Sequence, residues 1–422
     1  MSVDIREKIK VLFIADKWCA GNIDFGLSEW EGNLWSSLKS LDIAQVDVFH
    51  LDDYYRLHNK NGDNALLNKV DDFRPNLIFL IIYRMPGSDK NVPKCSTLDK
   101  IKNIFKIPMV AIWGDLEIPE QVSISKMLLP YIEFNVATAS SAALARINIP
   151  QKYIYMWVPK NKEYFNNTGA NHRDIDLSYV GSPKLDRLAK IRYLEKNNIR
   201  VMYGGGERQQ HFSLEEYANI LKRSKITLSF SRATYSHVIN ARPFEAMLCG
   251  TMVLEELNFE TPKLYTPFVD YVPYVSKADL LEKAKYYLSH IDEAKIIANN
   301  GNKKTETLYS AKRFWDLIIN KVLFNESIDN WTSKLPSLND ADLSRLPHKY
   351  SKRLKVLDRI CRNRISFFIY FNLVKIVDFR FYLSKAIALI RAILPDSVYR
   401  AVLSKVKVIF KKILIPKSNL PK

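Results

Sequence analysis

The chain has 422 residues, of which 47% are apolar and 26% are charged. Single hydrophobic cores stop growing at about 250 to 300 residues, so this length predicts at least two domains. The ordinary balance of apolar and charged residues excludes an extensively disordered protein.

The formal charge of +18 is concentrated at one end of the chain. Residues 345–422 hold 19 basic and three acidic side chains, a balance of +16, whereas residues 1–344 hold 44 basic and 42 acidic side chains, a balance of +2. The charge therefore does not indicate a nucleic-acid-binding body. It indicates a nearly neutral body followed by a cationic tail.

The cysteines and the N-terminal residues indicate a reducing compartment. Cys19, Cys95, Cys249 and Cys361 lie far apart, with no C-x-x-C pair and no cluster of histidines, which argues against a zinc site or a disulfide framework. The N-terminal residues are charged and lack the apolar stretch and cleavage site of a signal peptide. We expect a cytoplasmic protein.

The first half of the chain alternates predicted strands and helices. Short apolar runs, typical of strands that are covered on both faces, occur at 11–15, 46–50, 77–83, 109–113, 134–138 and 153–158. Ser28 and Glu31 have the spacing of a capping box, which predicts a helix that begins just after Ser28. Asp52 and Asp53 are interpreted as part of a loop. The pattern predicts one α/β domain over residues 1–159.

A polar segment over residues 160–175 is interpreted as a linker, after which the alternation begins again. Strands are predicted at 177–181, 199–203, 226–230 and 252–254, and helices at 184–197, 214–224, 243–249, 278–289 and 292–323. This predicts a second α/β domain over 176–325, followed by a tail over 326–422. Two doubly wound, Rossmann-like domains place a ligand-binding cleft where the carboxyl ends of their sheets face each other. Sugar transferases, sugar epimerases, periplasmic-type binding proteins and some dehydrogenases share this outline.

The most informative segment is 240–254, with the sequence NARPFEAMLCGTMVL. It resembles the R-x-F-E-A-x-x-C-G segment of nucleotide-sugar glycosyltransferases of the group 1 type, and is most similar to the one in proteins related to spore-maturation proteins. Shorter matches follow in the family's order at 176–182, 203–206 and 286–288. The resemblance implies a GT-B fold in a hexosyltransferase-like enzyme that uses neither a metal nor a redox cofactor.

Glu245 is the leading candidate for the donor site. It follows Pro243 at the beginning of a predicted helix, where its carboxylate can accept hydrogen bonds from two vicinal ribose hydroxyls. The resemblance assigns Glu245 this role in binding the nucleotide. The alternative is a favourable interaction between a glutamate and the helix dipole. Arg242 is a candidate for phosphate contact, with a structural ion pair to Glu245 as its alternative.

A second group of residues is expected to hold the diphosphate. Its members are Gly181, Ser182, Lys184, Arg187, Gly204, Gly205 and Arg208. Gly181 and Ser182 stand between a strand and a helix, where backbone N–H groups and the helix dipole favour an anion. Arg187 or Lys184 would add positive charge, unless each is an ordinary solvated helix residue. The glycines at 204 and 205 permit close approach of the backbone to the donor, or form a flexible turn, with Arg208 as a basic neighbour.

The acceptor side is expected in the first domain. Asp115 follows the predicted strand 109–113, and Asp24 lies in the loop after the first strand; either carboxylate is a candidate general base for the acceptor hydroxyl. A turn or cap role is the alternative for Asp115. His237 stands eight residues before Glu245, where the family often has a second glutamate that contacts the donor sugar. It is a candidate ligand of sugar or phosphate, or a packing residue, and the departure leaves the stereochemistry open.

Residues 350–415 alternate basic and apolar positions. Lys375, Asp378, Arg380 and Lys385 interrupt the apolar stretches before any of them reaches the roughly 20 residues that a membrane-spanning helix needs. The pattern predicts amphipathic α-helices that lie on an anionic membrane surface. The alternative is a helical bundle that packs on the body or joins copies of the chain. The apolar content argues against nucleic-acid binding.

These features predict transfer of a sugar from a nucleoside-diphosphate sugar to a hydroxyl of a surface-polysaccharide or lipid-linked acceptor. The enzyme would bind the inner face of the membrane through residues 345–422. One alternative is a nucleotide-sugar epimerase of the same fold, although such enzymes rarely need a membrane tail. Another is a non-catalytic sugar-binding or assembly protein, which the histidine at position 237 makes conceivable.

Overall fold

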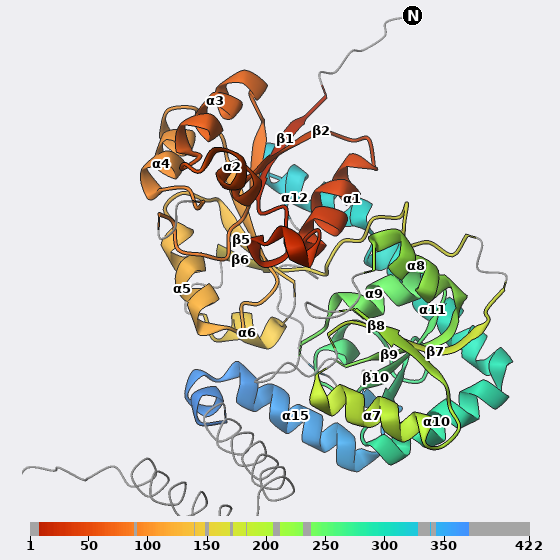
Figure 1. The fold of residues 1–422 in the computed structure, drawn as a ribbon. Helices are drawn as coiled ribbons and strands as arrows, with labels where there is room; N and C mark the ends of the chain where they lie inside the picture. The colour runs from red at the N-terminus through yellow and green to blue at the C-terminus, as the bar shows by residue number, and fades with distance from the viewer. Residues whose placement is uncertain are drawn as a thin grey trace, which may run out of the picture. The chain divides into compact units, whose positions relative to one another are not determined.

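The computed structural model describes residues 8–87, 91–138, 140–147, 152–168, 172–182, 184–205, 212–230, 238–327, 338 and 343–370. The chain divides into a compact unit Met1–Asn363 and a second unit Arg364–Lys422. The first unit contains two parallel β-sheets, each flanked by helices (Figure 1). The predicted α/β class with two doubly wound sheets is therefore confirmed.

The first sheet contains six parallel strands in the order β2-β1-β3-β4-β5-β6. Their bounds are β1 Lys10–Ala15, β2 Gln45–His50, β3 Leu77–Ile81, β4 Met109–Trp113, β5 Phe134–Ala137 and β6 Tyr153–Tyr155. Every residue of β3, β4 and β5 is buried, as expected for strands covered on both faces. Because β1 lies between β2 and β3, the strand order reverses direction at the carboxyl ends of β1 and β3.

The helices of this half are α1 Ser36–Lys39, α2 Leu51–His58, α3 Asp63–Phe73, α4 Cys95–Asn103, α5 Pro119–Leu128 and α6 Ser141–Ala145. Two 3₁₀ turns, η1 Cys19–Gly21 and η2 Ile23–Phe25, and the π-helix η3 Glu31–Trp35 precede α1. Asp52 and Asp53 lie in the first turn of α2, so the loop predicted for them is wrong. The Asp52 carboxylate accepts hydrogen bonds from the backbone N–H groups of Lys17 and Trp18, at 2.8 and 2.9 Å. The helix thereby fixes the loop that follows β1.

The capping box predicted at Ser28 forms only in part. The Ser28 hydroxyl accepts a hydrogen bond from the Glu31 backbone N–H at 3.1 Å, as the pattern predicts. The Glu31 carboxylate instead contacts Nε2 of His50, the last residue of β2, at 2.8 Å. A tertiary contact has therefore replaced the second half of the local motif.

The second sheet contains five parallel strands in the order β11-β10-β9-β7-β8. Their bounds are β7 Ile175–Val180, β8 Val201–Gly204, β9 Ser224–Ser229, β10 Met252–Glu256 and β11 Val272–Tyr274. The helices are α7 Leu185–Glu195, α8 Leu214–Arg223, α9 Ala241–Leu248, α10 Lys277–Ser289, α11 Ile291–Leu308 and α12 Ala311–Leu323, with the turn η5 Thr261–Lys263. The strand order reverses between β7 and β9, which places the carboxyl end of β7 at a switch point.

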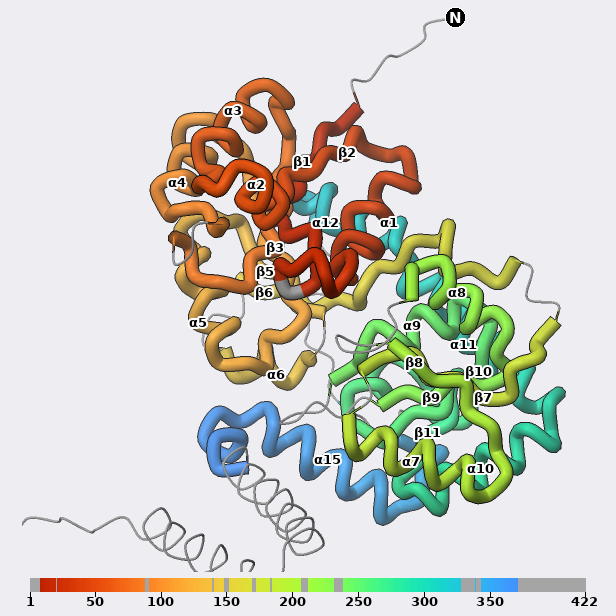
Figure 2. The backbone as a smooth tube through the Cα atoms, in the orientation of Figure 1, coloured from red at the N-terminus to blue at the C-terminus, as the bar shows by residue number. Residues whose placement is uncertain are grey.

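Helix α12 follows the second sheet in the sequence but packs on the first one (Figure 2). The Trp315 ring lies 5.7 Å from the ring of Phe13 on β1 and 5.1 Å from that of Phe79 on β3, measured between centroids. Its indole N–H donates to the Ser37 hydroxyl at 2.9 Å. The core of the first half thus includes a helix contributed by the end of the second half. The domain boundaries given above stay predictions.

Helix α15, which lies within the predicted tail, belongs to the body. Helix α15 (His348–Arg362) packs against α6, and its Leu354 and Cys361 are buried. Asp358 of α15 pairs with Lys263 at 2.8 Å, and Lys263 pairs with Glu260 at 3.0 Å. Glu260 also accepts hydrogen bonds from the hydroxyls and backbone at the beginning of α6. Helix α15 is therefore joined to both halves of the first unit.

No helix in the described part of the chain combines the length and apolar content needed to cross a bilayer. The tail positions that interrupt its apolar stretches, Lys375, Asp378, Arg380 and Lys385, lie outside the described residues. The amphipathic character of residues 371–422 stays a prediction.

Candidate functional site

The loop after β7 forms the centre of the predicted donor side. Gly181 has φ +150°, and a Cβ at this position would collide with the guanidinium of Arg242 and lie 3.1 Å from the Tyr179 hydroxyl. Only glycine therefore permits the close contact. Arg242, in the first turn of α9, donates from Nε to the Val180 carbonyl at 2.8 Å, and its guanidinium lies 4.9 Å from the centroid of the Tyr179 ring. Arg242 is thus held beside the backbone of the loop.

The other predicted diphosphate residues surround the same loop. The Gly181 N–H donates to the Gly204 carbonyl at 2.8 Å, and Gly205 follows with φ +91°. Arg187 donates from one nitrogen to the Tyr179 hydroxyl at 2.8 Å and to the Ser182 carbonyl at 3.1 Å. The structure therefore brings both glycine segments and Arg187 together. Lys184 caps α7 and is exposed, and Arg208 and His237 lie outside the described residues.

Glu245 is buried one turn after Arg242 on α9, with 4% of its surface exposed. Its Oε1 lies 2.7 Å from Nζ of Lys160, and its Oε2 accepts a hydrogen bond from the Tyr217 hydroxyl at 2.6 Å. Burial, followed by the negative charge of Glu245, raises the pKa of Tyr217 well above its usual value. Because an ionised carboxylate offers about four lone-pair sites, Glu245 keeps acceptor capacity for hydroxyls of a ligand.

Lys160 is a site residue that sequence reasoning missed. The predicted linker begins at this residue, yet Lys160 is 1% exposed, and Asn161 and Phe165 are also buried. The signal in the sequence was the apolar context, since Trp157 precedes Lys160 and Phe165 follows it; both are fully buried. The ion pair itself joins residues 85 positions apart, so no local pattern predicts it.

The predicted acceptor side gathers at the carboxyl ends of β1, β3 and β4. These strands are followed by Asp16, Tyr83 and Asp115, and parallel strands bring such residues to one edge of the sheet. The Tyr83 ring stacks on Trp30, with centroids 5.7 Å apart. Burial raises the pKa of Tyr83 well above its usual value, and the charges of Asp115, Glu29 and Asp16 raise it further. The three carboxylates therefore act on one phenol.

Asp115 has the environment expected of a general base. Its side chain is exposed to solvent, yet the surrounding protein displaces enough water to raise the pKa of its carboxyl above the ordinary 3.8. A base with a raised pKa removes protons more readily near neutral pH. Asp24 differs: it lies in the exposed turn η2, and no contact among the described residues joins it to Asp115.

Two further carboxyls near the acceptor side were missed. Burial raises the pKa of Glu117 to about 8, with a further contribution from the charge of Asp115, and its Oε2 has no hydrogen-bond partner among the described residues. Burial also raises the pKa of Asp16 to about 6, although its ion pair with Arg84 at 2.6 Å opposes the shift. Both shifts depend on tertiary burial, so the sequence alone carries no signal for them.

Glu29 connects the acceptor and donor sides. Its carboxylate lies 3.4 Å from Nζ of Lys160, the same ammonium that contacts Glu245. Burial lowers the pKa of Arg242, but the effects of neighbouring groups, among them Glu245 and Glu29, outweigh it and raise the pKa. Charges from both halves of the first unit therefore converge on the residues around Glu245.

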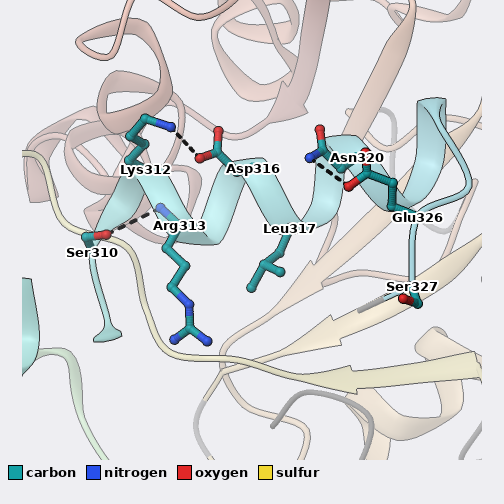
Figure 3. Close-up of a pocket in the computed structure, with 8 residues that line it drawn as sticks. All are labelled: Ser310, Lys312, Arg313, Asp316, Leu317, Asn320, Glu326 and Ser327. Carbon is teal, nitrogen blue, oxygen red and sulfur yellow. Dashed lines mark hydrogen bonds and ion pairs between the residues drawn. The ribbon is translucent and has the colours of Figure 1, made fainter. Parts of the chain in front are cut away.

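A surface pocket of about 230 Å³ lies elsewhere, along α12 and the residues after it (Figure 3). Its lining residues are Ser310, Lys312, Arg313, Asp316, Leu317, Asn320, Glu326 and Ser327. The Lys312 ammonium contacts the Asp316 carboxylate at 2.5 Å, and Asn320 donates to Glu326 at 3.1 Å. Because no predicted site residue lines this pocket, it carries no functional argument.

Residues 168–320 match the protein family described as "Glycosyl transferase-like". No curated protein is recognisably similar to the chain in sequence. The crystal structure of HepE from Anabaena in complex with UDP and glucose has a TM-score of 0.51 and 11% sequence identity, over 74% of this chain and 99% of that chain. A glycosyltransferase from Rickettsia africae ESF-5 has a TM-score of 0.50 and 10% identity, over 76% and 100%. At these identities, the similarity establishes the fold.

Proposed function

We propose that this chain is a glycosyltransferase of the group 1 type and transfers a sugar; the match of residues 168–320 to the glycosyl transferase-like family and the GT-B-like fold support this proposal. The donor is a nucleoside-diphosphate sugar, and the acceptor is a hydroxyl of a surface polysaccharide or a lipid-linked glycan. The bond between the anomeric carbon and the diphosphate oxygen breaks, and a bond between that carbon and the acceptor oxygen forms. The acceptor proton moves to a base, and the nucleoside diphosphate leaves.

The arrangement around Glu245 is the observation that carries the proposal. A buried carboxylate, a guanidinium held against a glycine loop and the beginning of α7 lie together at the switch point of the second sheet. Glu245 would accept hydrogen bonds from the ribose hydroxyls, and Arg242 with the Gly181 loop would hold the diphosphate. The proposal needs no metal ion, because these groups can stabilise the leaving diphosphate.

Asp115 is the proposed base of an inverting transfer. The supporting observations are its place after β4, its exposed carboxylate and its raised pKa. Protonation of Asp115 by the acceptor hydroxyl would accompany attack on the anomeric carbon. Because the HepE structure contains UDP and glucose, UDP-glucose is the first donor to test.

The proposed place of reaction is the cytoplasmic face of an anionic membrane. Residues 364–422 hold 12 basic and two acidic side chains. Within the described beginning of this unit, Ile365, Phe368 and Ile369 are exposed, by 73%, 68% and 54%. Apolar side chains next to cationic ones favour binding at a lipid surface. A lipid-linked acceptor would be present at that surface.

Thermal unfolding of the full chain with UDP, GDP, dTDP and CMP tests the proposal. A ligand at 100 times its Kd adds about 2.7 kcal/mol to the free energy of unfolding, so the correct nucleotide should raise Tm clearly. The matching nucleotide sugar should then release its nucleotide only when an acceptor is added, whereas an epimerase would convert the sugar without one. The family match favours transfer. Absence of stabilisation by all four nucleotides would contradict the proposal.

A further inference from the structure

The segment between the two sheets contributes a buried cation to the donor side. Lys160 follows β6 and precedes β7, and its side chain is 1% exposed. Its ammonium lies 2.7 Å from Oε1 of Glu245 and 3.4 Å from Oε1 of Glu29. Among the described residues, no acceptor other than these two carboxylates lies within hydrogen-bond distance of Nζ. Because a lysine ammonium has three N–H donors, Lys160 keeps capacity for a further acceptor.

The charges around Lys160 are balanced before any ligand binds. Two carboxylates, Glu245 and Glu29, face two cations, Lys160 and Arg242. Ribose hydroxyls are neutral, so their binding to Glu245 would not alter this balance. A nucleoside diphosphate adds about two or more negative charges, which need cations within a short distance. Arg187 carries a single positive charge, so it cannot supply all of the compensation.

The position of Lys160 also suits contact with phosphate. Arg242, which touches the Gly181 loop, and Glu245, which touches Lys160, are separated by about one helical turn of 5.4 Å on α9. In a nucleoside diphosphate, the phosphates are attached to the ribose through its 5′ oxygen. Because the diphosphate is attached to the ribose, a cation that contacts the ribose-binding carboxylate would lie close to the phosphates of a bound donor.

We propose that Lys160 is a donor-binding residue that contacts the diphosphate of the nucleotide while Glu245 binds the ribose. The inference rests on the proposed function, since it assumes that Glu245 faces a nucleotide. It adds a donor-binding residue from the segment between the sheets. This residue lies outside residues 168–320, which match the glycosyl transferase-like family. A neutral residue at position 160 would leave nucleoside binding intact and weaken nucleoside diphosphate binding.

Calorimetry or ligand-observed NMR with UDP and uridine distinguishes an effect on diphosphate binding from an effect on nucleoside binding. Lys160→Met should raise the Kd for UDP about tenfold or more, the scale of one charge-assisted hydrogen bond, and change the Kd for uridine by less than about twofold. If the panel of nucleotides selects GDP, GDP and guanosine replace this pair. Lys304→Met is the matched control. Lys304 lies on α11, outside the donor side, and also pairs with a carboxylate, that of Asp270 at 2.8 Å. The two Kd values of this variant should stay unchanged.

Each contrary result has a distinct meaning. If Lys160→Met raises the Kd for UDP and uridine by the same factor, Lys160 only positions Glu245, and the inference is wrong. If neither Kd changes, Lys160 has no role in binding, and the inference is again wrong. If the wild-type chain binds no nucleotide, the proposed function itself fails, and the inference fails with it.

A double variant covers the case in which Lys160→Met does not fold. Removing one partner of a buried ion pair leaves an uncompensated charge, whereas removing both charges avoids this penalty. Lys160→Met combined with Glu245→Gln is therefore compared with Glu245→Gln alone. A further rise of about tenfold in the Kd for UDP, with the Kd for uridine unchanged, supports the inference. Equal Kd values for UDP in the two variants would overturn it.

Discussion

The donor and acceptor sides of this protein differ in how tightly their residues are fixed. On the donor side, Glu245 and Arg242 are held by Lys160, Tyr217 and the Val180 carbonyl at 2.6 to 2.8 Å. On the acceptor side, Asp115 is exposed and Glu117 has a carboxyl oxygen without a hydrogen-bond partner among the described residues. The proposed function gives a chemical reason for the difference: nucleoside-diphosphate donors share a pentose and a diphosphate, whereas acceptors vary.

The two sides are nevertheless joined by buried contacts. Lys160 contacts a carboxylate from each side, and α12 returns from the second sheet to the first. Helix α15 adds a third connection, through Lys263 and Asp358 to Glu260 at the beginning of α6. The two sides therefore differ in how their site residues are held, whereas the packed elements that support them form one continuous structure.

Removing α15 should have the largest effect on stability. A chain that ends at residue 344 loses Asp358, one of the two carboxylates that pair with Lys263, and also loses the buried side chain of Leu354. Loss of a buried leucine side chain alone costs about 2 to 5 kcal/mol. A chain that ends at residue 363 keeps these contacts. Differential scanning calorimetry should show a lower Tm for the shorter chain only.

The chain ending at residue 363 should also lose binding to anionic vesicles. The full chain should float with vesicles less well as salt rises, because charge attraction is screened over about 8 Å at physiological ionic strength. If the chain ending at residue 363 floats with vesicles to the same extent as the full chain, residues 364–422 are not the anchor. If the chain ending at residue 344 has the same Tm as the full chain, α15 does not stabilise the body.

Asp115→Asn should reduce the transfer rate by about 10²- to 10⁴-fold, the usual contribution of a general base, with the Kd for the donor unchanged. The asparagine keeps the shape of the side chain but cannot take the acceptor proton. Asp24→Asn is the matched variant, since Asp24 is an acid in the exposed turn η2. If only Asp24→Asn loses activity, Asp24 is the base and the acceptor side has been assigned to the wrong carboxylate.

The sequence predicted the strands well because apolar runs define them. Strands β1 to β10 lie at the predicted positions, within a few residues, whereas β11 (Val272–Tyr274) was missed; the proline at its centre argues against a strand. The break between α11 and α12 at Ser310 was also missed, although its hydroxyl caps α12 by accepting from the Arg313 N–H.

The site was predictable only where chemistry leaves a local signature. Glu245 and Arg242 stand three residues apart in one motif, and the structure places them beside Gly181. Lys160 was assigned to a linker because its partner lies 85 residues away. Glu117 was missed because its raised pKa arises from tertiary burial and from the charge of Asp115. Local periodicity does not predict burial or ion pairs between residues that are far apart in the sequence.

Glu117→Gln should change the pH dependence of stability by a few kcal/mol, at about 1.4 kcal/mol per pKa unit. Because burial raises the pKa of Glu117 from 4.5 to about 8, the folded state favours the protonated form. Its contribution to stability is complete below pH 4.5 and is lost as the pH rises through 8. Chemical unfolding between pH 5 and 9 should show this decline in the wild type and a flatter profile in Glu117→Gln. Identical profiles would show that Glu117 is not protonated in the folded state.

The most direct test of the account is calorimetric titration of the nucleoside diphosphate into the wild-type chain and into Glu245→Gln. Loss of a charged hydrogen-bond partner should weaken binding by about 1 to 3 kcal/mol, roughly fivefold to more than a hundredfold in Kd. Because the variant replaces the charged partner that lies 2.7 Å from Lys160 by a neutral amide, thermal unfolding must first show that it is folded at the temperature of titration. The account predicts measurable binding by the wild type and clearly weaker binding by the folded variant. Equal Kd values for the two folded proteins would contradict the assignment of the ribose site to Glu245.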